Sequence, residues 1–251
     1  MYDFSIIIPT YNEYDSLPNI IIDISKIFKN YKIQILVIDD NSTDNTHSLF
    51  NHETNLFKNI NFNKKSALIT FTKGENQLTY IKNKINYGKG YAIKLSQKYI
   101  NSKFTVIQDA DYEYDPNDLN KFIKIALEKR DFGLILGKRF FSDYNYTFPF
   151  YHYLANKFLS NLFSLLYNQK ISDIEVGYKF FKSEIFKKLE ITKNDFGIEI
   201  ELISKYLKLY KDKKIIEINI NYFPRTFQEG KKIKFKDGIL AIYYILYYRF
   251  F

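Results

Sequence analysis

The chain has 251 residues and no cysteine, so it is long enough to bury a large core and holds neither disulfides nor thiolate metal sites. Its three histidines form no His-x-His or His-x-x-x-His pair, which disfavours a zinc site. The formal net charge of +9 favours anionic partners, such as phosphorylated substrates or an acidic membrane surface, and no motif for nucleic acid accompanies it. No signal-peptide pattern follows Met1, so we expect a cytosolic setting.

Strand and helix patterns alternate along the chain with short connections. This order predicts an α/β fold with a mostly parallel sheet, in which ligands bind at the carboxyl ends of the strands. Apolar or alternating runs predict strands at 4–9, 33–38, 67–71, 104–107, 133–137, within 173–181, and at 215–222. Helical patterns cover 15–28 (capped by Asp15 or Ser16), 44–50, 90–100, 116–129, 148–167, 196–209 and 238–251.

Acidic side chains follow three of these strands where each strand ends. Glu13 follows the first strand, Asp39 and Asp40 follow the second, and Asp109 and Asp111 follow the strand that ends at 107. Like charges at one sheet edge repel one another unless a cation or a ligand's donors use them. Asp109 and Asp111 are one residue apart, so on an extended backbone they point to the same side and suit Mg²⁺ or Mn²⁺ that also bridges substrate phosphates. The alternative for this pair alone is a solvated turn.

Two further segments point to an anionic ligand. Lys89 lies between Gly88 and Gly90 at the start of a predicted helix, where glycines let the backbone approach an anion closely. The Gly-x-Gly-x-x-Gly dinucleotide pattern is not completed. The second segment, 224–234, is a basic loop.

Two apolar segments occupy the second half of the chain. The apolar helical face within 148–167 predicts a helix packed against the core, and contact with lipid is the alternative. The apolar residues at 238–251 number about fourteen, fewer than the roughly twenty needed to span a bilayer. We therefore expect an interfacial or amphipathic helix there, or a contact in a homodimer.

Taken together, these stretches resemble the family 2 glycosyltransferases of the GT-A fold, and most closely the branch that transfers mannose or glucose to dolichyl or polyprenyl phosphate. The resemblance implies a single GT-A domain over 1–251, with a nucleotide-sugar-binding half at 1–115, an acceptor-binding half at 116–236 and the apolar helix at 237–251. The matching stretches keep the family's order and are 7–13, 37–44, 86–90, 108–111 (the Asp-x-Asp motif), 137–139, 173–181, 196–201 and 224–238.

The resemblance also implies roles for individual residues. Asp109 and Asp111 would hold Mg²⁺ or Mn²⁺ against the diphosphate of the donor, with Ala110 contributing backbone. The nucleotide-sugar site would further include Lys89, and the diphosphate or an acceptor phosphate would be bound by Arg139, Arg225 and Lys231. The nucleoside would be held by Pro9, Tyr11, Glu13, Asp39 and Asp40.

The implied reaction is inverting transfer of a hexose from a donor of the GDP-mannose or UDP-glucose type to a polyprenyl or dolichyl phosphate, on the cytosolic face of a membrane. Asp111 and Arg225 would act at the reacting centre. An anionic phosphate acceptor needs no general base, whereas a hydroxyl acceptor on a glycan or another sugar does. Asp173 is the first candidate for that base, ahead of Glu175 and Glu199.

Lys179 stands where mannosyl-transferring members carry arginine, and 229–233 departs from their Gly-Ser-Lys-Leu loop, so the sugar and the acceptor stay open. Two other classes fit less well. An enzyme that makes sugar nucleotides needs an amino-terminal glycine-rich phosphate loop, and this chain has none. A relative that only binds lipid or a partner would be expected to have lost one aspartate of the Asp-x-Asp pair.

Overall fold

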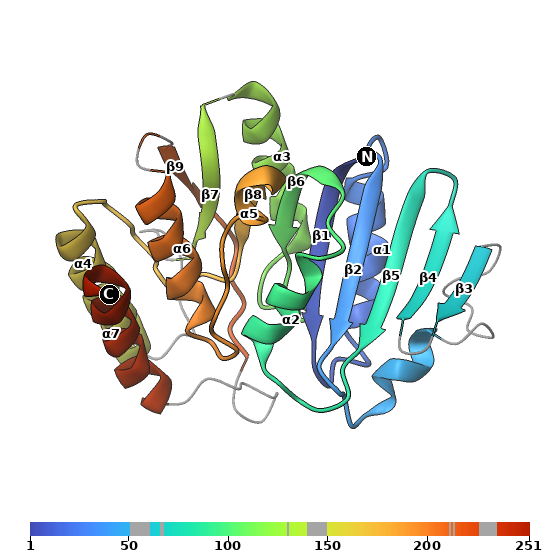
Figure 1. Ribbon diagram of the computed structural model, residues 1–251, viewed down its shortest axis with the longest axis horizontal. Coiled ribbons are helices and arrows are strands. Elements are labelled where there is room, and N and C mark those ends of the chain that lie inside the picture. Colours follow the sequence, from blue (N-terminus) through green and yellow to red (C-terminus); the bar gives the residue numbers. More distant parts are fainter. Residues whose placement is uncertain are drawn as a thin grey trace.

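The structure is a computed structural model that describes residues 1–50, 61–65, 68–129, 131–139, 150–210, 212, 214–225 and 235–251. Its strands form one sheet in the order β3-β4-β5-β2-β1-β6-β8-β7-β9 (Figure 1). The strands are β1 (Tyr2–Thr10), β2 (Ile33–Asp39), β3 (Asn61–Lys65), β4 (Leu68–Lys73), β5 (Asn76–Lys82), β6 (Ser102–Ile107), β7 (Phe132–Lys138), β8 (Lys179–Lys182) and β9 (Lys214–Asn219).

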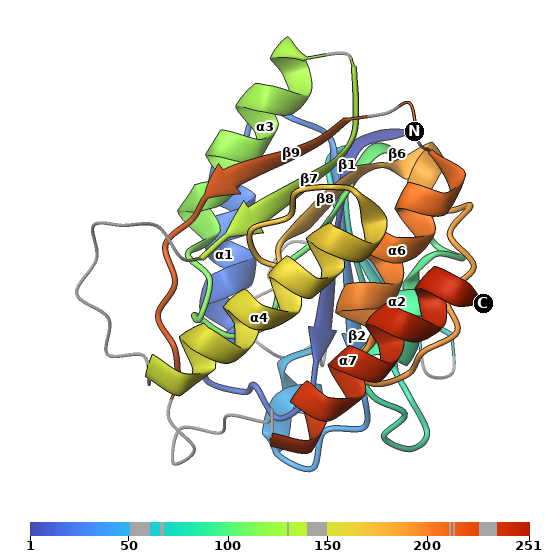
Figure 2. The ribbon, with the colours of Figure 1, turned by 90° about the vertical axis from the view of Figure 1, so that its left-hand side faces the viewer.

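Helices cover both faces of this sheet. In Figures 1 and 2, α1 and α3 lie on one face, and α2 and α6 lie on the other. The helices are α1 (Leu17–Ile27), α2 (Lys89–Ser96), α3 (Leu119–Glu128), α4 (Phe150–Tyr167), α5 (Ser183–Phe186), α6 (Ile198–Leu209) and α7 (Phe235–Phe250), with the 3₁₀ helices η1 (Asn45–Phe50) and η3 (Pro116–Asp118).

The centre of the sheet is parallel, as predicted. β1 pairs in parallel with β2 on one side and β6 on the other, and β2 pairs in parallel with β5. All residues of β2 are buried, which explains why this run is apolar apart from Gln34 and the terminal Asp39, whose side chains are hydrogen-bonded. The carboxyl ends of these parallel strands therefore meet at one edge of the sheet.

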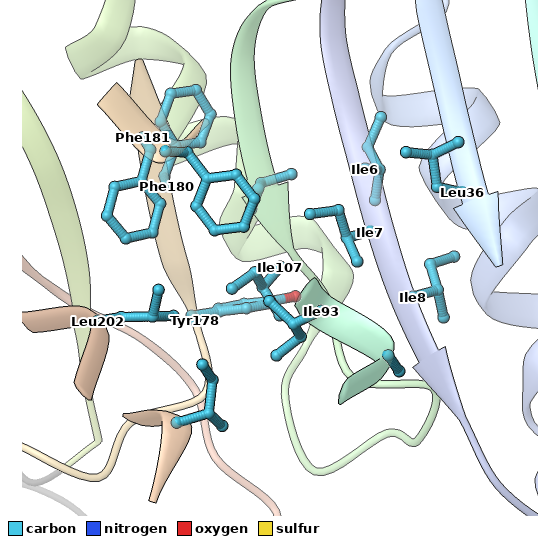
Figure 3. Packing of buried hydrophobic residues seen from close by; sticks show 14 of the residues in the cluster. Ile6, Ile7, Ile8, Leu36, Ile93, Ile107, Tyr178, Phe180, Phe181 and Leu202 are labelled. Carbon is cyan, nitrogen blue, oxygen red and sulfur yellow. The ribbon is translucent and has the colours of Figure 1, made fainter. Parts of the chain in front are cut away.

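The core lies on both sides of β1 and β6. Figure 3 shows Ile6, Ile7 and Ile8 along β1, with Phe180 of β8 and Ile93 of α2 nearby. Each of these five side chains is completely buried. Through this packing β8, which comes late in the chain, shares one core with the amino-terminal strands.

The predicted strands and helices are confirmed, with local differences. The stretch before residue 80 gave one predicted strand, but it contains β3, β4 and β5, which form an antiparallel extension of the sheet. The predicted helix at 44–50 is the 3₁₀ helix η1, and α5 was not predicted. Ser16 occupies the cap position of α1 without making the side-chain capping bond.

The last helix, α7, packs on α6 and on α4, and Figure 2 shows α4 and α7 side by side. The Tyr167 hydroxyl at the end of α4 donates to the Ile245 carbonyl of α7 at 3.1 Å. Among the described residues, neither these helices nor any other combines the length and the apolar character that crossing a bilayer requires.

Candidate active site

A pocket of about 320 Å³ opens at the carboxyl ends of the parallel strands. Thr10 at the end of β1 is in register with Asp39 at the end of β2, and Ile7 is in register with Ile107 at the end of β6. The residues that follow β1 and β6 therefore converge, as the sequence predicted. The predicted site residues that line the pocket are Pro9, Tyr11, Glu13, Asp40, Lys89, Asp109, Ala110, Asp111, Arg139 and Arg225, together with Glu175 and Glu199.

Asp109 and Asp111 both line the pocket, and each is paired with a cation. Lys89 Nζ lies 2.6 Å from Asp109 Oδ1, and Arg225 Nη2 donates to Asp111 Oδ2. Burial and the neighbouring Asp109 raise the pKa of Asp111 to about 7, although Arg225 opposes this shift. The site therefore carries more negative charge in one place than a buried carboxylate tolerates, which is the condition that a bound cation relieves.

Lys89 belongs to a chain of alternating charges that leads away from the pocket. Its Nζ also lies 2.9 Å from Glu199 Oε1, and the other oxygen of Glu199 accepts from Lys179. Lys179 is completely buried and donates to the Val176 carbonyl as well. Burial lowers the pKa of Lys89, but Asp109 and Glu199 outweigh it and raise that pKa above its usual value. Glu199 is thus held by two ammonium groups, and it fixes Lys89 beside Asp109.

The glycines around Lys89 serve the backbone rather than an anion. A Cβ on Gly88 would lie 2.3 Å from the Asn194 carbonyl oxygen, and a Cβ on Gly90 would lie 2.3 Å from the Lys193 carbonyl oxygen. Gly90 N–H donates to the Asn194 carbonyl at 2.8 Å. The predicted close approach is real, but it is made to the loop before α6, and this contact places Lys89.

Asp40 lines the pocket and holds the same loop. Its carboxylate accepts from the backbone N–H groups of Tyr87 at 2.9 Å and Gly88 at 2.6 Å, and from Asn83 Nδ2 at 2.8 Å. Three donors already use its oxygens, so its evident role is to shape the segment that leads into α2.

Asp39 lies outside the pocket and is completely buried. Its oxygens accept from the Tyr80 hydroxyl at 2.5 Å and the Ser42 N–H at 2.7 Å. The predicted contact between Asp39 and a nucleoside is therefore not supported by this geometry, because its carboxylate is turned into the sheet.

Arg225 joins the loop after β9 to the ends of β1 and β6. Its guanidinium makes two bonds of 3.2 Å to the Glu13 carboxylate, besides the bond to Asp111, and its backbone N–H donates to Glu113 Oε1 at 3.0 Å. Glu13, predicted to hold the nucleoside, is a partner of this arginine. Lys231 lies outside the described residues.

Arg139 and Asp173 form a buried ion pair behind the pocket. Arg139 Nε and Nη2 donate to the two Asp173 oxygens at 2.7 and 2.8 Å, and Asn156 Nδ2 donates at 2.9 Å. Although burial alone would raise it, Arg139 holds the pKa of Asp173 below its usual value. Asp173 is fully buried and does not line the pocket, so the structure corrects its expected role: it orients Arg139 and is not placed to deprotonate an acceptor.

The Asp173→Asn variant is expected to lose about 3 kcal/mol or more of its free energy of unfolding, because the neutral amide leaves a buried guanidinium without its counter-charge. Urea denaturation measures this loss. Asp131→Asn is the matched control, because Asp131 pairs with Lys214 only at the exposed surface, where the pair contributes little. A variant at 173 with unchanged stability but no turnover would instead restore Asp173 as the base.

Three contributions to the pocket were not predicted. The Ser16 hydroxyl donates to the Ala110 carbonyl at 2.7 Å and so ties the start of α1 to the Asp-x-Asp segment. Glu113 lines the pocket and anchors Arg225. The inner side of α7 forms a wall through Leu240, Ala241 and Tyr244.

The contact that places this wall is specific. The Tyr244 hydroxyl donates to Asp195 Oδ2 at 2.8 Å, and a Cβ on Gly197 would lie 2.2 Å from the Tyr244 ring. The only sequence signal was the spacing of the buried face of α7, namely Ala241, Tyr244, Ile245 and Tyr248.

Acidic side chains and cations gather around a pocket at the ends of parallel strands, the edge where ligands of such sheets bind. The sequence model of Glycosyl transferase family 2 matches residues 5–190. The chain therefore belongs to glycosyltransferase family 2.

Two relatives are similar over most of this chain. Glycosyltransferase AglJ of Haloferax volcanii is 25% identical over 222 residues, which cover 88% of this chain and 63% of AglJ. Dolichyl-phosphate beta-glucosyltransferase of Dictyostelium discoideum is 26% identical over 252 residues, which cover 91% of this chain and 68% of that protein. The chain thus spans less than two thirds of the length of AglJ.

Solved structures share the fold. Glucosyl-3-phosphoglycerate synthase from Mycobacterium tuberculosis, in complex with Mn²⁺, UDP and glucosyl-3-phosphoglycerate, superposes with a TM-score of 0.68 at 15% identity, covering 98% of this chain and 80% of that one. The same enzyme with Mg²⁺ and UDP gives 0.67 at 16% identity, covering 98% of this chain and 79% of that one. This likeness confirms the predicted GT-A fold.

Proposed function

We propose that this glycosyltransferase moves a hexose, with inversion, from a nucleotide-sugar of the GDP-mannose or UDP-glucose type to a polyprenyl or dolichyl phosphate at the cytosolic face of a membrane. The observation that carries the proposal is the pocket in which Asp109 and Asp111 face Lys89 and Arg225. The similarity to a dolichyl-phosphate beta-glucosyltransferase supports the acceptor class.

The pocket fits a divalent cation, Mg²⁺ or Mn²⁺, held by Asp109 and Asp111. The fit rests on the two acidic side chains that share the site and on the raised pKa of Asp111. Within the described residues, no group of three or more His, Cys, Asp or Glu could hold a metal. Oxygens of the donor diphosphate and water would therefore complete the ligand set. The cation would neutralise charge on the departing nucleoside diphosphate.

Lys89 and Arg225 would bind the diphosphate of the donor. Lys89 pairs with Asp109 and Arg225 pairs with Asp111, so both cations lie beside the carboxylates that would hold the metal and the diphosphate. A guanidinium binds phosphate oxygens with two parallel bonds, and an ammonium acts as a point charge. Glu199, itself braced by buried Lys179, would keep Lys89 in position as its partners change.

The placement of Asp173 favours a phosphate acceptor over a hydroxyl. A phosphate oxygen is already anionic and attacks without losing a proton, whereas a hydroxyl needs a base. The first candidate base is buried in an ion pair with Arg139, and Glu199 is held by two ammonium groups. For a hydroxyl acceptor on a glycan, Glu175 would be the remaining one of the three candidate bases, and it lines the pocket.

The test is formation of a glycolipid. The full chain is incubated with polyprenyl phosphate, Mn²⁺ and radiolabelled GDP-mannose or UDP-glucose, and the label is extracted into organic solvent. We expect one donor to label the lipid, and the labelled product to be labile to mild acid as a sugar phosphate is. Transfer of label only to water-soluble glycans would replace the lipid acceptor with a hydroxyl acceptor.

A further inference from the structure

The outer sides of α4 and α7 are apolar where helix surfaces are usually polar. On α7, exposed apolar residues recur at helical spacing, while the residues of the opposite side are buried against the rest of the protein. We name these exposed residues the α4–α7 surface, and they are Leu154, Phe158 and Leu165 of α4 with Ile239, Tyr243, Leu246, Tyr247 and Phe250 of α7.

The two helices form one continuous face. They run side by side in Figure 2 and contact each other, and the Arg249 guanidinium lies 5.6 Å from the centre of the Tyr167 ring. Their inner sides are occupied by the rest of the protein, so their exposed sides share one surface. Apolar patches of this kind mark an interaction site.

Among the residues of α4 and α7 whose side chains the structure describes, the charges have one sign. The sequence of α4 contains no Asp or Glu, and neither does 238–251. The charged residues there are Lys157 of α4 and Arg249 of α7, both exposed. A second copy of the chain would oppose these cations with cations, whereas an anionic lipid surface complements them. The tyrosines suit the same partner, since their rings are apolar and their hydroxyls remain hydrated at a membrane interface.

We propose that the α4–α7 surface lies in the interface of an anionic bilayer and holds the enzyme there. The pocket adjoins this surface, because Leu240 both lines the pocket and is 41% exposed, next to Ile239. An amphiphilic phosphate would thus reach the pocket while its hydrocarbon chain stays in the bilayer. This second point rests on the proposed function, whereas the bilayer contact itself does not.

The test measures partition of the full chain onto vesicles of phosphatidylcholine with about 30% phosphatidylglycerol, an anionic lipid, at low and high salt. The Leu165→Glu/Phe250→Glu variant places one charge on each helix at positions 80% and 66% exposed, so folding is preserved. Ile22→Glu/Leu127→Glu is the matched control, because these residues are exposed on α1 and α3, at a different face of the molecule.

We expect the α4–α7 variant to partition at least about tenfold more weakly than wild type, and the control to match wild type, because each buried apolar side chain adds to membrane affinity. Equal partition of all three proteins, or no vesicle binding by wild type, would overturn the proposal. So would a dimer in light scattering that the variant abolishes while vesicle binding stays absent, since the surface would then cover a second copy. Vesicle binding without any glycolipid product would support this surface and contradict the proposed acceptor.

Discussion

Asp109→Asn is expected to lower kcat/KM for the nucleotide-sugar by about 10³-fold, with most of the loss in kcat. The asparagine removes one anionic ligand of the proposed cation. Lys89 pairs with the carboxylates of Asp109 and Glu199, and after the substitution Glu199 is the one of these two that remains. The cation would then be held less tightly beside the diphosphate, on which negative charge develops in the transition state. A loss of about 4 kcal/mol of transition-state stabilisation lowers the rate by about 10³-fold. Initial rates at several Mn²⁺ concentrations measure the effect.

Asp115→Asn is the control for this substitution. Asp115 lies in the same loop but does not line the pocket, and its carboxylate accepts from Asn117 N–H at 2.9 Å at the start of η3. Asparagine serves equally well at such a position, so turnover should stay near wild type. Near-normal turnover of Asp109→Asn at low Mn²⁺ would contradict the role of the Asp-x-Asp pair.

Arg225→Ala is expected to lower kcat/KM by about 10²- to 10³-fold, and Arg225→Lys is expected to recover only part of the loss. The guanidinium contacts Glu13 and Asp111 together, so it is positioned to bind two oxygens of a phosphate at once. A lysine ammonium in its place keeps the positive charge but lacks the two parallel N–H donors of the guanidinium. Steady-state kinetics of both variants measures the difference.

Two controls accompany the Arg225 variants. Lys121→Ala removes a cation that bonds the Asn219 carbonyl at the surface outside the pocket, and it should leave turnover unchanged. Urea denaturation of Arg225→Ala shows whether the unpaired Glu13 and Asp111 have destabilised the fold. Equal activity of the lysine and alanine variants would mean that the arginine does not act through its geometry.

Sequence periodicity predicted the centre of the fold because most residues of β1, β2 and β6 are buried and apolar. Ser5, Gln34 and Thr105 interrupt these runs, and each of them is buried and hydrogen-bonded. Of the three strands between residues 61 and 82, β4 was predicted, whereas β3 and β5 were missed for the opposite reason. Lys and Asn interrupt β3, and polar residues alternate in β5, so neither run resembles a buried strand. These strands depend on pairing with their neighbours rather than on their own pattern.

The acidic residues of the site were predicted because strand ends converge by topology. Their partners were not predictable in the same way, since ion pairs join residues far apart in the sequence. Arg139 lies 34 positions from Asp173, and Arg225 lies 114 positions from Asp111. Asp173, the first residue of the matching stretch 173–181, was the first candidate for a base, but it is buried in an ion pair with Arg139. The glycines beside Lys89 misled similarly, because tight packing against a loop and approach to an anion require the same residue.

Ion pairs connect Asp109 to Lys89, Lys89 to Glu199, and Glu199 to Lys179. This chain of ion pairs explains why a lysine stands at position 179. Lys179 is completely buried and reaches Glu199 and the Val176 carbonyl at the same time. Burial lowers its pKa, with Glu199 opposing. Lys179 does not line the pocket and reaches it only through Glu199 and Lys89.

The most direct test of the donor site is calorimetric titration of the wild-type chain with UDP and GDP, each with and without Mn²⁺. We predict that one of the two nucleotides binds, that binding requires the metal, and that Asp109→Ala weakens it by about 100-fold or more. The base that binds also identifies the donor. Absence of binding by both nucleotides with Mn²⁺ and with Mg²⁺, or equal affinity of wild type and Asp109→Ala, would contradict the assignment of this pocket to a nucleotide-sugar.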